Sequence, residues 1–98
     1  MQSRADRIQS ALSRALSPIR IAVEDDSGRH AGHAGARADG ETHYNVLVVT
    51  SAFDGTTRVG RHRIVNQLLA AEFAAGLHAL SLTLLTPDED ASRGPVRP

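Results

Sequence analysis

The chain has 98 residues, 41% of them hydrophobic, which suits one small domain with a single core and is too short for two. Eleven basic residues, all Arg, balance eleven acidic ones, so net charge gives no general attraction to nucleic acid, and the lack of cysteine excludes disulfides and thiolate metal ligands from this chain. No apolar run approaches the roughly 20 residues of a membrane span, and the N-terminus lacks the apolar segment of a secretory signal. We therefore expect a cytoplasmic protein without membrane association.

The N-terminal region carries apolar residues at helical spacing. A stripe at i, i+3, i+4, i+7 and i+8 predicts a helix over residues 5–16, ended by Pro18. The helix is rich in Arg and Ser, as organellar presequences are, but it leads directly into a strand, so we assign it to the folded domain. The alternation of Ile19, Ile21 and Val23 with less apolar neighbours predicts that first strand. The stripe consists of Ile8, Ala11, Leu12, Ala15 and Leu16.

The middle of the chain contains a long segment without periodicity. Residues 24–40 are mainly acidic residues, Gly, Ala and His, so we expect a flexible loop, and long loops in small domains are usually functional or disordered. Residues 44–50 predict a second strand, in which the continuous apolar run 46–49 is typical of a central position. The first two strands are expected to pair antiparallel.

The C-terminal half predicts a helix followed by a third strand. Residues 53–55 form a turn, and residues 56–60 could hold one short helical turn. The main helix is expected over residues 61–75, with Gly76 as a left-handed cap, and the third strand over residues 77–85. A strand, helix, strand connection makes its two strands parallel, so the sheet should be mixed. The apolar stripe of the main helix is expected at Ile64, Leu68 and Ala71, flanked by Val65, Leu69 and Phe73.

Five short motifs, in one order along the chain, resemble those of the BolA family. They are EDDSGRH at 24–30, GETHY at 40–44, FDG at 53–55, RHRIVNQLLAAE at 61–72 and LHAL at 77–80. Each motif alone is weak evidence, but five in order are specific. The resemblance implies an α+β fold of order α-β-β-α-α-β, with a three-stranded mixed sheet similar to a type II K-homology domain. We therefore expect a single domain over residues 1–98, with its core at about 5–87 and a flexible tail at 88–98.

Histidines are the candidate metal ligands. From the residues alone, His78 is most often a partly buried, hydrogen-bonded side chain, because it shares its predicted strand face with Leu80, Leu82 and Leu84. The resemblance implies instead that His78 is a ligand of a 2Fe-2S cluster. It also implies a second ligand in the loop, and the family's register places that ligand at His30, ahead of His33.

The chain can supply only part of such a cluster site. Two histidines cannot hold a 2Fe-2S cluster alone, so the resemblance implies cysteine thiolates from a monothiol glutaredoxin and from glutathione. Imidazole ligands on one iron raise the reduction potential above that of all-thiolate clusters. We therefore expect no cofactor tightly bound by the isolated chain, which should be a monomer or a weak homodimer.

The remaining two histidines are expected to be structural. His43 precedes the second strand, and His62 lies in the first turn of the main helix between two arginines. Cations at a helix N-terminus oppose the helix dipole, so this basic triplet indicates either an anionic partner or a solvated turn.

The resemblance implies an iron-sulfur adaptor, and the alternative function is a DNA-binding transcriptional or morphology regulator. Arg58, Arg61 and Arg63 would supply the phosphate contacts. K-homology domains use a Gly-x-x-Gly loop between helices, whereas here four residues separate Gly55 from Gly60. The sequence contains no nucleophile elbow, Walker loop or His-Glu-x-x-His helix, so we expect no enzymatic activity.

Overall fold

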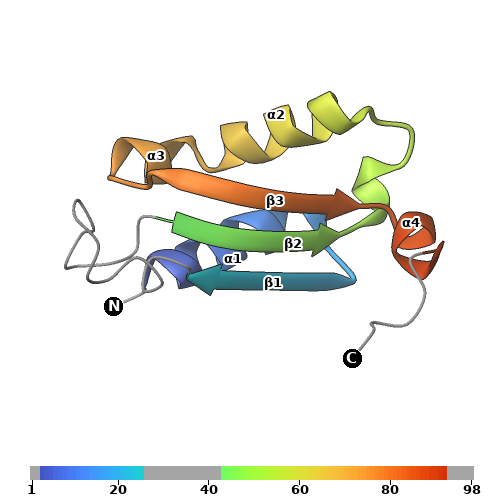
Figure 1. Cartoon of the computed structure of the whole chain (residues 1–98), viewed down its shortest axis with the longest axis horizontal. Helices are drawn as coiled ribbons and strands as arrows, with labels where there is room; N and C mark the ends of the chain where they lie inside the picture. Colours follow the sequence, from blue (N-terminus) through green and yellow to red (C-terminus); the bar gives the residue numbers. More distant parts are fainter. Residues whose placement is uncertain (1–2, 26–42, 93–98) are drawn as a thin grey trace.

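The computed structural model describes residues 3–25 and 43–92, which form a small α+β unit around a three-stranded mixed sheet (Figure 1). The expected fold class is therefore confirmed. In chain order the elements are α1 (Arg4–Leu16), β1 (Arg20–Asp25), β2 (His43–Val49), the 3-10 helix η2 (Ser51–Phe53), α2 (Arg58–Leu68), α3 (Ala70–Ala74), β3 (Ala79–Leu85) and α4 (Pro87–Ser92).

The sheet has the order β1-β2-β3, with β2 in the centre as its continuous apolar run predicted. β1 pairs antiparallel with β2, with Arg20 opposite Val49 and Asp25 opposite Tyr44. β2 pairs parallel with β3, and His43 is opposite Ala79. Consequently the end of β1 and the beginnings of β2 and β3 lie at one end of the sheet.

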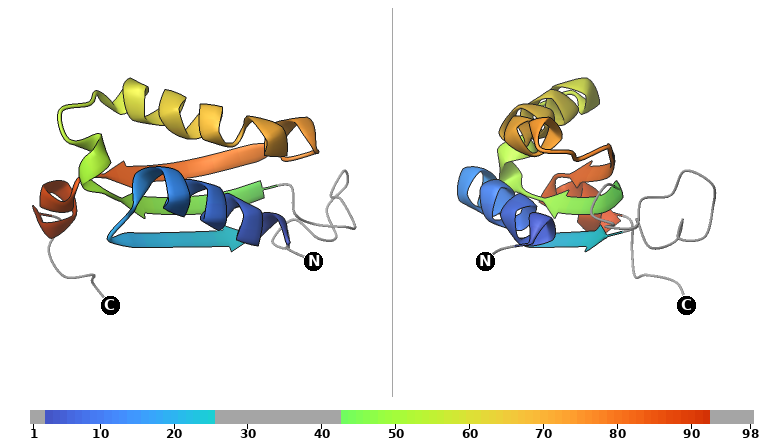
Figure 2. Two further views of the ribbon diagram at one scale, coloured as in Figure 1. Left: turned by 180° about the vertical axis from the view of Figure 1, so that it is seen from behind. Right: turned by 90° about the vertical axis from the view of Figure 1, so that its left-hand side faces the viewer.

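α1 and α2 lie side by side on one face of the sheet (Figure 2). α1 begins with a capping box, because the Ser3 hydroxyl accepts a hydrogen bond from the Asp6 backbone N–H at 3.1 Å and the Asp6 carboxylate accepts one from the Ser3 N–H. The helix buries Ile8, Leu12 and Leu16, which confirms most of its predicted stripe.

The predicted main helix differs from the structure in its bounds and in its buried face. It begins at Arg58 rather than 61, with Thr57 as its N-cap, and it ends at Leu68, after which the short α3 follows. Its buried stripe contains Val65 and Leu69, whereas Leu68 and Ala71 of the predicted stripe are exposed. The helix is rotated because Arg61, one turn before Val65, also faces inward.

The core lies between the helices and the inner face of β2. Tyr44, Val46 and Val48 alternate toward the helices, as expected for a strand with one face on the core. The buried hydrophobic cluster comprises Ile8, Leu12, Leu16, Tyr44, Val46, Val48, Phe53, Val65, Leu69, Leu77 and Leu84.

The segment after β3 is helical, where a flexible tail was expected from residue 88. Thr86 and Glu89 cap α4 reciprocally: the Thr86 N–H donates to Glu89 Oε1 at 2.9 Å, and the Glu89 N–H donates to Thr86 Oγ1 at 3.1 Å. Arg20 of β1 also pairs with Asp90. Residues 88–92 therefore belong to the folded unit, and residues 93–98 lie outside the described part of the chain.

Candidate metal-ligand site

His78 lies immediately before β3 and is exposed. The sequence predicted a partly buried side chain on the strand face of Leu80, Leu82 and Leu84, whereas His78 is exposed and β3 begins one residue later, at Ala79. An exposed imidazole at the beginning of a strand can reach a metal centre outside the chain, whereas a histidine packed among leucines could not.

The backbone that carries His78 is fixed by the preceding turn. Leu77 is 4% exposed, and its N–H donates to the Glu72 carbonyl oxygen at 2.9 Å. Gly76 has a φ of +119°, within the positive region that favours glycine, as the sequence predicted. The ring of His78 therefore projects from a backbone that is held on its N-terminal side.

Two arginines of α1 hold this turn from a distant part of the chain. The Glu72 carboxylate accepts hydrogen bonds from Arg7 Nε at 2.9 Å and Arg7 Nη2 at 3.1 Å, and Arg4 Nε lies 3.3 Å from it. Arg4 Nη2 also donates to the Ala75 carbonyl oxygen at 2.8 Å. The hydrogen bond from Arg7 is the main cause that lowers the pKa of Glu72. No local sequence pattern indicates the contact between Arg7 and Glu72, because the two residues are 65 positions apart.

His43 is the residue that the structure unexpectedly brings to His78. Their ring centres are 5.4 Å apart with an angle of 46° between the ring planes. The parallel pairing of β2 with β3 causes this proximity, since His43 is opposite Ala79, the neighbour of His78. A small hollow of about 130 Å³ lies beside His43 and is lined by Tyr44, Asn45, Ala79, Leu80 and Ser81 as well.

The two loop histidines, His30 and His33, lie outside the described residues. The described residues that flank their segment are Asp25, at the end of β1, and His43, at the beginning of β2. Asp25 and His43 lie at the same end of the sheet as His78 (Figure 1). We call this end of the sheet the histidine end and define it by His43 and His78. Within residues 3–25 and 43–92, no group of three or more His, Cys, Asp or Glu is arranged to hold a metal ion.

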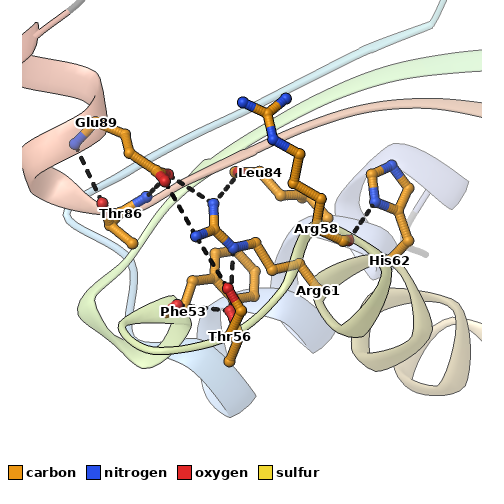
Figure 3. Close-up of polar contacts among 8 residues, drawn as sticks. All are labelled: Phe53, Thr56, Arg58, Arg61, His62, Leu84, Thr86 and Glu89. Carbon is orange, nitrogen blue, oxygen red and sulfur yellow. Dashed lines mark hydrogen bonds and ion pairs between the residues drawn. The ribbon is translucent and has the colours of Figure 1, made fainter.

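Arg61 lies at the opposite end of the sheet and is 5% exposed. Its guanidinium forms a two-pronged pair with Glu89, at 2.6 Å from Nη1 to Oε1 and 3.1 Å from Nη2 to Oε2 (Figure 3). Nη1 also donates to the Leu84 carbonyl oxygen at 3.0 Å, and Nε donates to Thr56 Oγ1 at 3.0 Å. The guanidinium carbon lies 5.7 Å from the centre of the Phe53 ring. We call this region the arginine end and define it by Arg61 and Glu89.

The charges at the arginine end stabilise each other. The hydrogen bond with Glu89 raises the pKa of Arg61, and the hydrogen bond from Arg61 lowers the pKa of Glu89 to about 2. Arg61 therefore holds α4 against the end of β3. Its expected contact with nucleic-acid phosphate does not fit this placement, because its donors face the interior and are already used.

The other residues of the basic segment are exposed on α2. Arg58 and Arg63 are exposed, and Figure 3 shows the Arg58 guanidinium directed away from the Arg61 network. The His62 ring Nδ1 lies 2.9 Å from the Arg58 carbonyl oxygen. The helix begins at Arg58, so the Arg-His-Arg triplet at 61–63 lies three residues after its first residue. The predicted conflict between the triplet's positive charges and the helix dipole is therefore smaller than expected.

The family can now be assigned. A family model described as BolA-like protein matches residues 12–89, and the fold of the described residues agrees with it. The chain belongs to the BolA family. The predicted resemblance is thereby confirmed.

Relatives of known name support this assignment. The chain is 45% identical over 95 residues to Protein BOLA1, chloroplastic, of Arabidopsis thaliana, covering 95% of this chain and 59% of the relative. It is 47% identical over 91 residues to SufE-like protein 1, chloroplastic/mitochondrial, of the same plant, covering 89% of this chain and 24% of the relative. A solved structure, the BolA domain of SufE1 from Arabidopsis thaliana, aligns with a TM-score of 0.80 at 46% identity, over 91% of this chain and 98% of that one.

The two named relatives are longer than this chain and carry organelle names. The chain spans 59% and 24% of the lengths of the two named relatives, both of which are assigned to organelles by name. Among the described residues, no helix has the length and apolarity needed to cross a membrane. A cytoplasmic location thus stays a prediction.

Proposed function

We propose that this BolA-like protein is a non-catalytic adaptor that binds a monothiol glutaredoxin across a shared 2Fe-2S cluster. Its role would be cluster assembly, cluster transfer or iron sensing. Membership of the BolA family and the likeness to a relative named SufE-like support a role in an iron-sulfur pathway. The observation that carries the proposal at the level of residues is the exposed His78 on a backbone fixed by Leu77.

The donor atoms of the chain fit a shared cluster and not a resident one. The sequence contains no cysteine, so every thiolate must come from a partner protein or from glutathione. His78 can offer one imidazole nitrogen at the histidine end. Imidazole is a suitable ligand for iron, and with thiolates on the other iron it gives a cluster of raised reduction potential.

The second ligand of the chain is assigned to the loop between β1 and β2. We place it at His30 ahead of His33, as the family register implies. This assignment is compatible with the described residues, because the segment that contains both histidines begins after Asp25 and ends before His43, at the histidine end. The chain then contributes two imidazole ligands, and the partner protein and glutathione contribute the thiolates.

The test uses the purified chain mixed with a monothiol glutaredoxin, glutathione, iron and sulfide. The wild-type mixture should elute as a coloured heterodimer in gel filtration. His78→Ala should lose or change the visible absorption spectrum of the complex, whereas His62→Ala, which removes an exposed histidine from α2, should leave it unchanged. A native spectrum with His78→Ala would disprove the role of His78. Comparison of His30→Ala with His33→Ala would then identify the loop ligand.

A further inference from the structure

The distance between the His43 and His78 ring centres fits two ligands of one metal ion. A Zn–N bond is about 2.0–2.1 Å and the ring centre lies roughly 1.1 Å beyond the nitrogen, so two imidazoles on one tetrahedral ion have their centres about 5 Å apart. The observed separation is 5.4 Å.

We propose that His43 and His78 together bind a divalent first-row cation of the Zn²⁺ class in the free chain. Imidazole nitrogen is a common ligand for zinc, copper and nickel. This proposal does not depend on the proposed function, because it requires neither glutaredoxin nor glutathione. It assigns to His43 a role that differs from the structural one expected from the sequence.

The backbone at both histidines is held in place before any ion binds. His43 is the first residue of the central strand, and the next residue, Tyr44, is 2% exposed in the core. His78 follows Leu77, which is 4% exposed and bonded to the Glu72 carbonyl oxygen. The parallel register between β2 and β3 sets the distance between the two histidines. Little conformational entropy must therefore be lost when an ion brings the two rings onto one centre.

The site would be open and exchangeable. No third His, Cys, Asp or Glu in residues 3–25 and 43–92 joins the pair in a ligand cluster, so water would complete the coordination of the ion. Such a site should bind more weakly than a closed structural site with four protein ligands. Since His78 is also the proposed ligand for the shared cluster, an ion held there would have to leave before the cluster could use that imidazole.

The experiment is a calorimetric titration of the metal-free chain with Zn²⁺ alone. His43→Phe keeps an aromatic ring but removes both ring nitrogens, and His78→Ala removes the other ligand. Each change should weaken the tightest zinc binding at least tenfold. The combined variant His43→Phe/His78→Ala should lose little more zinc affinity than either single variant, because the same site is removed in each case. His62→Ala is the matched control and should bind as the wild type does. The double variant His30→Ala/His33→Ala should also retain the site.

Several results would overturn the proposal. They are a wild-type chain that does not bind Zn²⁺, an unchanged affinity in His43→Phe, an equal loss in His62→Ala, or a loss that occurs only when His30 and His33 are replaced. His43→Asn serves as a second variant, and circular dichroism shows whether each variant is folded. A chain that fails to bind Zn²⁺ but still forms the coloured glutaredoxin complex would disprove this inference while the proposed function stands.

Discussion

The two ends of the sheet use polar residues in opposite ways. At the arginine end, the guanidinium of Arg61, a residue that is 5% exposed, donates to Glu89, Thr56 and the Leu84 carbonyl oxygen. At the histidine end, His78 is exposed, and its ring lies beside His43 at the beginning of the strands. One end uses its donors inside the protein, whereas the other has an imidazole, that of His78, at its surface.

This difference separates stability from binding. A buried guanidinium whose N–H groups are all hydrogen-bonded, as in Arg61, holds two elements together but has no donor left for a ligand. An exposed imidazole such as that of His78 contributes little to stability, since substitutions of exposed residues usually change it by less than about 0.5 kcal/mol. Of the three arginines predicted to contact phosphate, Arg61 is therefore used inside the protein, whereas Arg58 and Arg63 remain exposed.

The largest effect is expected from Arg61→Ala, which removes a buried side chain together with a donor to the Leu84 carbonyl and leaves Glu89 without its partner. Urea unfolding should show a loss of about 2–3 kcal/mol, the range for breaking a buried polar network. Arg63→Ala, on the exposed side of the same helix, is the control and should change stability by less than about 0.5 kcal/mol. Equal, small losses in the two variants would contradict the comparison between the ends.

Much of the fold followed from local sequence patterns. The three strands, the central position of β2 and the positive φ of Gly76 were predicted, because each depends on periodicity, connection length or one glycine. The inward face of α2 was missed, since it depends on the pairing of Arg61 with Glu89, 28 residues later. α4 could have been predicted, because the residues T-P-D-E at 86–89 carry the capping-box spacing with proline at the first helical position.

The candidate site was predicted only in part, for a physical reason of the same kind. His78 stood out because of its motif, whereas the proximity of His43 depends on the parallel register of two strands that are separated by 29 residues. The pairs from Arg4 and Arg7 to Glu72 join α1 to the turn before His78. Contacts between distant segments are set by packing and leave no periodic signal in the sequence.

An intermediate effect is expected from pH. The folded-state pKa of Glu89 is about 2, below its ordinary value of 4.5, so its ionised form stabilises the fold above pH 4.5 and this contribution is lost as the pH falls toward 2. The urea midpoint should therefore decrease through this window. Glu89→Gln should flatten the decrease without abolishing it, because the lowered pKa of Glu72 acts in the same direction. An unchanged pH dependence in Glu89→Gln would show that the arginine end does not hold α4 by charge.

The smallest effect is expected from the double variant Arg58→Ala/Arg63→Ala, which removes the exposed cations of α2 and leaves Arg61 in place. Its stability and its coloured glutaredoxin complex should match those of the wild type, since neither side chain belongs to the arginine end or the histidine end.

The same double variant also tests the alternative function, DNA binding. Affinity for duplex DNA falls with salt at a slope of about −0.9 for each phosphate neutralised, so loss of two contacts should reduce that slope by about 1.8. Fluorescence anisotropy with a labelled duplex at several salt concentrations measures the slope. Binding that keeps the wild-type slope would exclude this face of α2 as a DNA contact.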